Sequence, residues 1–200
     1  MQAGRGGANA TRKRNAIVFA CVVVVWFAVD SLTKSHFNGL YEQGEAATGP
    51  ILGLVRFRLV HNTGMAWGMF DDSTFLLGAL SLVVCAALVA YLFVLSPRAS
   101  LLETLGISFV VAGGLGNAVD RFLLGYVVDF IEPTFIDFPV FNVADIGVTC
   151  GFVLFLVGML LAGRRESREE ALAAGASPAR PQSPSGEAGS GEGDEGSDGR

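Results

Sequence analysis

The sequence is poor in charge. Only 16% of its 200 residues are charged, whereas 51% are hydrophobic, and the mean hydropathy is +0.49. A soluble domain needs more charge than this to cover its surface. The composition therefore excludes an ordinary soluble enzyme and indicates a protein that is surrounded by lipid.

Metal-binding side chains are also scarce. The chain has three cysteines and two histidines, and no two cysteines are spaced as CxxC. Each cysteine lies in a different apolar run, where a thiol behaves as a small hydrophobic group. An odd number of cysteines without a CxxC pair argues against a disulfide framework and against a zinc site. With only two histidines as well, we expect no metal site.

What the chain does have is four long apolar runs. A helix needs about 20 residues to cross a hydrocarbon core of about 30 Å, and runs of this order cover residues 16–32, 75–95, 101–119 and 144–162. The first run follows basic residues, as a cleaved signal peptide does, but no small-x-small cleavage site follows Val29. We predict an all-α membrane protein with four transmembrane helices.

Basic residues predict the orientation of these helices, because Lys and Arg stay on the cytoplasmic side of a membrane. The opposite side receives only Lys34, Arg56, Arg58 and Arg121. We therefore expect a multi-pass protein of the cytoplasmic membrane with residues 1–15 as a cytoplasmic tail, 16–163 as the membrane domain and 164–200 as a disordered cytoplasmic tail. The residues assigned to the cytoplasmic side are Arg5, Arg12, Lys13, Arg14, Arg98, Arg164, Arg165 and Arg168.

A long outer segment, residues 33–74, separates the first two runs. Within it, hydrophobic and basic side chains alternate over residues 55–60, with Val55, Phe57 and Leu59 on one face. A period of two is typical of a strand. We predict a small extracytoplasmic β-containing region here.

Polar residues gather at the outer ends of the predicted helices. Ionisable groups are costly at a membrane and often mark a substrate or ion path. We expect these side chains to surround one site near the outer surface. They are Asp30 at the end of the first run, Asn117, Asp120 and Arg121 at the end of the third, Asp129 in the following connection, and Asn142 and Asp145 at the start of the fourth.

Taken singly, these residues also have structural interpretations. Asn142 and Asp145 fit the N-cap and N3 positions of the fourth helix. Asp30 with Lys34, four residues apart on a helix, fits an ion pair. Asp120 with Arg121 fits another. These interpretations stay open beside the functional one.

Two of the carboxylates suggest a reaction. If Asp129 and Asp145 lie close together, both cannot ionise easily, and they share one proton. One carboxylate then removes a proton from water while the other donates to a carbonyl oxygen. Such a pair is able to hydrolyse a peptide bond.

Four separated blocks carry a resemblance to a known family. They are DSLTK at 30–34, HNTGMAWGMF at 61–70, GGLGNAVDRFLLGYVVDFI at 113–131 and FNVADIG at 141–147. In this order they resemble the lipoprotein signal peptidases, the type II signal peptidases of bacteria. The resemblance implies a bacterial membrane aspartyl endopeptidase that cleaves diacylglyceryl-modified prolipoproteins before the lipidated cysteine, with its active site near the extracytoplasmic face.

The resemblance also implies roles for single residues. It places the catalytic pair on Asp129 and Asp145, without metal or organic cofactor. Apart from prolipoproteins and membrane lipid we expect no partner, no nucleic acid among them, and a monomer. The residues that the resemblance places around the pair and the substrate are Asp30, Asn62, Gly64, Asn117, Asp120, Arg121 and Asn142.

Glycines and departures from the family pattern bear on the shape of the site. Gly113, Gly114 and Gly116 remove bulk and let a neighbouring helix or a substrate come close, while Gly64 fits a turn. The departures remove no proposed catalytic group. They are Ser31, Met65, Trp67, Ile146 and Gly147.

Three other functions fit part of the pattern. Lys34 with Ser31 or Ser35 would make a serine peptidase in which a desolvated lysine is the base. In a small membrane transporter or channel subunit the aspartates would form an ion relay, although the middle of each run lacks ionisable groups. A membrane scaffold would need neither Asp129 nor Asp145.

Overall fold

The structure, a computed structural model, describes residues 3–64, 73–96 and 98–175. Residues 1–165 form one compact unit, which holds all the polar residues singled out by the sequence, and the chain from residue 166 onward belongs to a second unit. Met65 and Trp67 lie outside the described residues. The elements are α1 (Ala3–Leu40), β1 (Val55–Asn62), α2 (Thr74–Ala90), the π-helical turn η2 (Tyr91–Leu95), α3 (Leu101–Leu123), β2 (Val127–Pro133) and α4 (Val143–Gly175).

Within the described residues, four segments are long and apolar enough to cross a membrane. They are Asn9–Leu40, Thr74–Leu95, Leu101–Leu123 and Val143–Leu172, and each contains most or all of one predicted run. Large hydrophobic side chains on these helices are exposed, such as Val24, Leu80 and Val153. In a membrane such side chains face lipid, so the predicted fold of four transmembrane helices with a small β region is confirmed.

α3 is the central helix, and it packs against α1 and α2. Its small residues allow this close packing. A Cβ atom at Gly113 would overlap the backbone carbonyl of Ala144 in α4, and one at Gly116 would overlap the carboxylate of Asp30 in α1. A Cβ atom at Gly114 would likewise meet a side chain of α2. The packing role predicted for these glycines is therefore confirmed.

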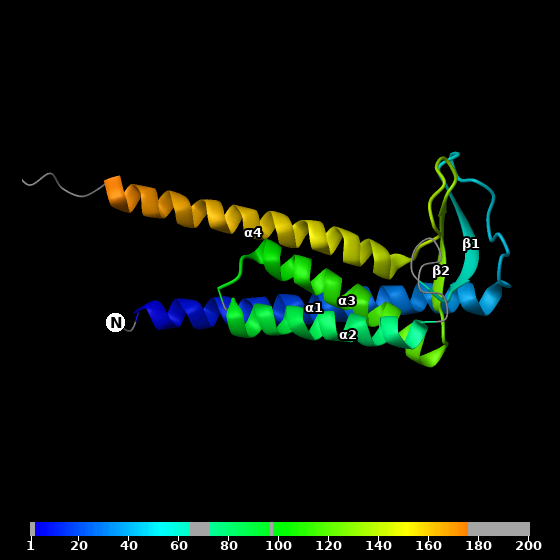
Figure 1. Cartoon of the computed structure of the whole chain (residues 1–200), viewed down its shortest axis with the longest axis horizontal. Coiled ribbons are helices and arrows are strands. Elements are labelled where there is room, and N and C mark those ends of the chain that lie inside the picture. The colour runs from blue at the N-terminus through cyan, green and yellow to red at the C-terminus, as the bar shows by residue number, and fades with distance from the viewer. Residues whose placement is uncertain (1–2, 65–72, 97, 176–200) are drawn as a thin grey trace, which may run out of the picture. The chain divides into compact units, whose positions relative to one another are not determined.

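β1 and β2 form a two-stranded antiparallel sheet, in which Val60 lies opposite Asp129 and Asn62 lies opposite Val127. The sheet lies at the end of the helices where α1 and α3 finish and α4 begins (Figure 1). The alternating pattern correctly predicted β1. Residues 127–133 differ from the prediction, which has a connection there, because residues 127–130 are all buried and a strand segment buried on both faces lacks that alternation.

Two helices are longer than predicted. α1 begins at Ala3 and α4 continues to Gly175, so part of each predicted tail is helical. In α4 the added residues are rich in Ala, Glu and Arg, which are strong helix formers. In both helices, extending an existing helix is easier than nucleating a new one. The last part of the predicted C-terminal tail, residues 176–200, lies outside the described residues.

Candidate active site

Asp129 lies in the middle of β2, and only 2% of it is exposed. Its Oδ2 accepts a hydrogen bond from Nδ2 of Asn62 at 2.9 Å, and its Oδ1 accepts one from Nδ2 of Asn142 at 2.7 Å. The strand register explains the first contact. Asn62 pairs with Val127, which is two residues from Asp129 and on the same face of β2.

Asp145 lies in the first turn of α4. Its backbone N–H donates to Oδ1 of Asn142 at 3.0 Å, and its Oδ2 accepts from the backbone N–H of Asn142 at 3.1 Å. This reciprocal pair is a capping box, so the N-cap and N3 interpretation is confirmed. The other oxygen, Oδ1, accepts a hydrogen bond from Nδ2 of Asn117 at 2.8 Å. Asp145 therefore caps the helix and also joins the polar network.

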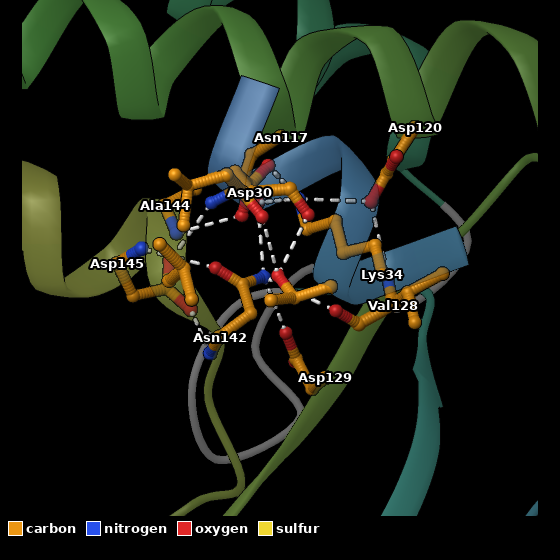
Figure 2. A network of polar contacts seen from close by, with 12 residues as sticks. Asp30, Lys34, Asn117, Asp120, Val128, Asp129, Asn142, Ala144 and Asp145 are labelled. Carbon is orange, nitrogen blue, oxygen red and sulfur yellow. Dashed lines mark hydrogen bonds and ion pairs between the residues drawn. The ribbon is translucent and has the colours of Figure 1, made fainter. Parts of the chain in front are cut away.

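Asn142 connects the two aspartates (Figure 2). Its side chain donates to Asp129, and its backbone donates to Asp145. The residue is fully buried, and its Nδ2 also lies 3.0 Å from Oδ1 of Asn117 and 3.3 Å from the backbone oxygen of Val128. One residue therefore holds both carboxylates in place.

A buried ammonium group on α1 supports this network. Nζ of Lys34 lies 2.9 Å from Oδ2 of Asp30, 3.0 Å from Oδ2 of Asp120 and 2.9 Å from Oδ1 of Asn117. These three acceptors match the three hydrogens of an ammonium group. The contact with Lys34 orients the side-chain amide of Asn117. Its oxygen faces the ammonium group, and its Nδ2 donates to Asp145. The predicted ion pair between Asp30 and Lys34 is confirmed.

The carboxylates of Asp129 and Asp145 line the same cavity, which has a volume of about 500 Å³. Arg121 lies in its wall and donates to the backbone oxygens of Asn117 at 3.3 Å and Gly64 at 3.4 Å. The rest of the lining comprises Asn62 and a mainly apolar set: Val127, Phe138, Val140, Phe141, Ile146, Thr149 and Cys150. The cavity therefore combines a polar wall with an apolar one.

Burial raises the pKa of the Asp129 carboxyl to about 7, and the negative charge of Asp145 contributes in the same direction. Hydrogen bonds from Asn62 and Asn142 lower this pKa, but they do not offset the burial. Near neutral pH the carboxyl group of Asp129 therefore readily carries a proton, which makes it a candidate proton donor.

The structure brings together all nine residues that the sequence singled out. Asn62, Gly64, Asn117, Arg121, Asp129 and Asp145 line the cavity, whereas Asp30, Asp120 and Asn142 belong to the network beside it. Gly64 lies in the predicted turn, because its N–H donates to Oδ1 of Asn62 at 3.0 Å.

One prediction was wrong, and one residue was missed. Within the described residues Asp120 forms its ion pair with Lys34 and not with Arg121, and its Oδ2 also accepts from the backbone N–H of Val128 at 3.2 Å. A neighbour in sequence on a helix points in a different direction, so it is a poor partner. Lys34 belongs to this network but is not among the predicted site residues, although a lysine four residues from Asp30 in a chain so poor in charge is a usable signal.

The chain is similar to known proteins over most of its length. Residues 22–161 match the family described as signal peptidase (SPase) II. A lipoprotein signal peptidase of Microcystis aeruginosa is 39% identical over 141 residues, which are 70% of this chain and 89% of that protein. A lipoprotein signal peptidase of Lactiplantibacillus plantarum is 33% identical over 146 residues, which are 72% of this chain and 94% of that protein.

A similar fold occurs in solved structures. A bacterial membrane enzyme determined by the in meso method at 2.3 Å resolution has a TM-score of 0.66 and 29% sequence identity, covering 71% of this chain and 87% of that chain. A second such structure, at 1.9 Å resolution, has a TM-score of 0.64 at the same identity and covers 92% of that chain.

Proposed function

This chain belongs to the signal peptidase II family, and we propose that it hydrolyses its substrates with Asp129 and Asp145 as the catalytic pair. It is a protease of a bacterial membrane that removes signal peptides from prolipoproteins. The observation that carries the proposed aspartic mechanism is that both carboxylates line one cavity and Asn142 is bonded to both. The raised pKa of Asp129 adds to this support.

In this mechanism Asp129 holds the shared proton and Asp145 is the base. Asp145 takes a proton from a water molecule, whose oxygen attacks the peptide carbonyl carbon, while Asp129 protonates the carbonyl oxygen. The tetrahedral intermediate then breaks its C–N bond, and Asp145 gives its proton to the leaving nitrogen. Asp129 recovers its proton from the hydroxyl group as the new carboxyl group forms, so the pair returns to its starting state.

The proposed cleavage site precedes a cysteine that carries a diacylglyceryl group. The apolar lining, with Val140, Phe141 and Ile146, suits an acyl chain or an apolar signal segment, and the polar wall with Arg121 suits ester and peptide carbonyls. We further propose that the enzyme acts as a monomer and that its lipid substrate enters from the bilayer.

The proposed topology places both termini in the cytoplasm and the cavity near the extracytoplasmic face. Support comes from Asn15, whose Nδ2 donates to the backbone oxygen of Ala99 at 2.9 Å. This contact brings the basic start of the α1 span next to the turn between α2 and α3, where Arg98 lies. The basic residues near the start of α1 and Arg98 in the α2–α3 turn therefore lie at the same end of the helices, away from the sheet (Figure 1), as the positive-inside rule predicts for a cytoplasmic end.

The rival functions have less support. Lys34 forms ion pairs with Asp30 and Asp120 and donates a hydrogen bond to Asn117, so its ammonium group is held in the charged form and is poorly suited to act as a base for Ser31 or Ser35. The transporter alternative is not favoured, because the family to which the chain belongs and its sequence relatives are peptidases.

A cleavage assay tests the proposal. Purified wild-type protein should cleave a diacylglyceryl-modified prolipoprotein and leave its unlipidated form intact. Asp129→Asn and Asp145→Asn should each lower kcat by roughly 10²–10⁴-fold, because an amide takes no part in proton transfer. A chelator should have no effect on the wild type.

Asp137→Asn is a matched control, since Asp137 lies on the exposed connection between β2 and α4. It should leave kcat unchanged. Retained turnover in the purified Asp129→Asn/Asp145→Asn double variant would overturn the aspartic mechanism, and equal cleavage of lipidated and unlipidated substrates would overturn the proposed substrate class.

A further inference from the structure

The peptide group between Val143 and Ala144, directly before Asp145, is held at both ends by side chains of α1. Nε1 of Trp26 donates to the oxygen of Val143 at 3.2 Å, and the N–H of Ala144 donates to Oδ1 of Asp30 at 2.8 Å. Trp26 and Asp30 are four residues apart, so they lie on the same face of α1. Figure 2 shows Asp30 next to the backbone of Ala144.

Both contacts use backbone hydrogen-bonding groups that the helix does not fully use: a free N–H group and a second lone pair on a carbonyl oxygen. The N–H of Ala144 is among the first N–H groups of α4, which have no partner within the helix. The oxygen of Val143 has two lone pairs, so it accepts the indole N–H in addition to a helical hydrogen bond. Contacts at the two ends of one planar peptide unit fix its rotation. The Cα atom of Asp145 follows one residue later.

The place of the indole ring is itself set by close contacts. A Cβ atom at Gly147, one helical turn after Val143, would overlap Nε1 of Trp26 and lie 2.9 Å from its Cδ1. The ring also packs edge-on against Phe109 of α3, with ring centroids 4.9 Å apart. Trp26 therefore occupies the space that the absence of a side chain at Gly147 leaves.

We propose that Trp26 is a positioning residue for Asp145. By holding the oxygen of Val143 while Asp30 holds the N–H of Ala144, it fixes the first turn of α4 and with it the direction of the Asp145 carboxylate. This inference rests on the proposed catalytic role of Asp145. It assigns a functional role to a residue that is not among those lining the cavity.

The test compares steady-state cleavage of a diacylglyceryl-modified prolipoprotein by wild-type protein and Trp26→Phe. The phenyl ring retains much of the packing against Phe109 but lacks the N–H donor. We expect kcat to fall about tenfold and KM to change by less than about twofold, because small misplacements of a catalytic group affect the chemical step. The melting temperature in detergent should stay close to that of the wild type.

Phe19→Leu is the matched control. Phe19 also lies on α1 and makes an edge-on contact, with Phe93 at a centroid distance of 5.4 Å. It donates no hydrogen bond to α4, so its loss should leave kcat unchanged. An equal fall of kcat in Phe19→Leu and Trp26→Phe would overturn the proposal, because loss of packing alone would explain both.

Gly147→Ala provides a second, independent route to the same change. Its Cβ should displace the indole from Val143 and lower kcat to a similar extent, and it keeps the proposal testable if Trp26→Phe fails to fold. Because both substitutions break one hydrogen bond, their combined effect should be smaller than the product of the single effects. Full additivity, or unchanged kcat in both variants, would overturn the inference.

Asp145→Asn separates this inference from the proposed function. If Asp145→Asn is inactive while Trp26→Phe has wild-type kcat, the positioning role fails and the catalytic pair stands. If Asp145→Asn retains wild-type activity, the catalytic pair itself fails, and the positioning role fails with it.

Discussion

Strand β2 carries two carboxyl groups, Asp129 and Glu132, only three residues apart but in opposite environments. Burial raises the pKa of Asp129 to about 7. Hydrogen bonds from Arg56 and Arg58 lower the pKa of Glu132 to about 2. An odd separation along a strand puts side chains on opposite faces, so neighbouring acids of one strand meet different surroundings. For these two acids, the face of the sheet on which each lies decides whether its pKa is raised or lowered.

The two faces also hold opposite arrangements of charge. On the side of Asp129, one ammonium group, Lys34, lies between the carboxylates of Asp30 and Asp120, with exposed side-chain fractions of 4%, 1% and 13%. On the other side, the carboxylate of Glu132 lies between two guanidinium groups that are 39% and 32% exposed.

Exposure decides what each arrangement contributes to stability. Removing one partner from a buried ion pair leaves an uncompensated charge and costs about 3–5 kcal/mol. An exposed pair contributes only about 0–1 kcal/mol, since water solvates the separated partners well. Each cluster therefore has one central ion between two partners of the opposite sign, but the stability of the protein should respond very differently to substitution in the two clusters.

The largest expected effect follows from Lys34→Met. This substitution removes the ammonium group and leaves Asp30 and Asp120 buried without a positive partner. We expect the free energy of unfolding to fall by about 3–5 kcal/mol, measured by SDS titration in mixed micelles. Adding Asp30→Asn and Asp120→Asn to Lys34→Met should restore part of the stability, because no buried charge then lacks a partner. A loss below about 1 kcal/mol in Lys34→Met would contradict the contrast between the two clusters.

The second expected effect concerns the pH dependence of cleavage. The pKa of Asp129 is raised, so its carboxyl group stays protonated until the pH rises through about 7 and is ionised above it. Because the proposed pair needs one proton, kcat should fall about tenfold for each pH unit above this value. Asn62 donates to Asp129 and lowers this pKa, so Asn62→Leu should move the alkaline limb to higher pH.

Glu132→Gln is the control for that profile. It changes an acid on the same strand whose pKa lies near 2, far below the range of the alkaline limb. In Glu132→Gln, kcat should begin to fall at the same alkaline pH as in the wild type. If Glu132→Gln moved the limb as far as Asn62→Leu does, the two faces of the sheet would not be independent.

The smallest expected effect is that of Glu132→Gln on stability. A pKa lowered from 4.5 to about 2 stabilises the fold above pH 4.5, and this contribution is lost as the pH falls from 4.5 to 2. Because the arginine partners are about one third exposed, the difference from wild type should be at most about 1 kcal/mol at pH 7. Unfolding measured at pH 7 and at pH 3 should show the difference shrinking toward the lower pH.

Part of the site was predictable because it follows from the order and spacing of residues along the chain. Apolar runs locate the helices, and charge bias predicts which of their ends lie together. The capping positions of Asn142 and Asp145 follow from their spacing before an apolar run. Lys34 was harder to assign, because its two further partners, Asp120 and Asn117, come from α3, more than 80 residues away in sequence.

The sequence by itself determined that this chain spans a membrane with four helices, that its polar residues collect at one end, and which family it resembles. Only the tertiary structure decided that Asp129 lies on a buried strand, that Asn142 is bonded to both aspartates, and that Trp26 reaches the peptide group before Asp145. The physical reason is that apolar length and helix spacing are local properties of the chain. Burial and hydrogen-bond partners arise only when segments distant in sequence pack against one another.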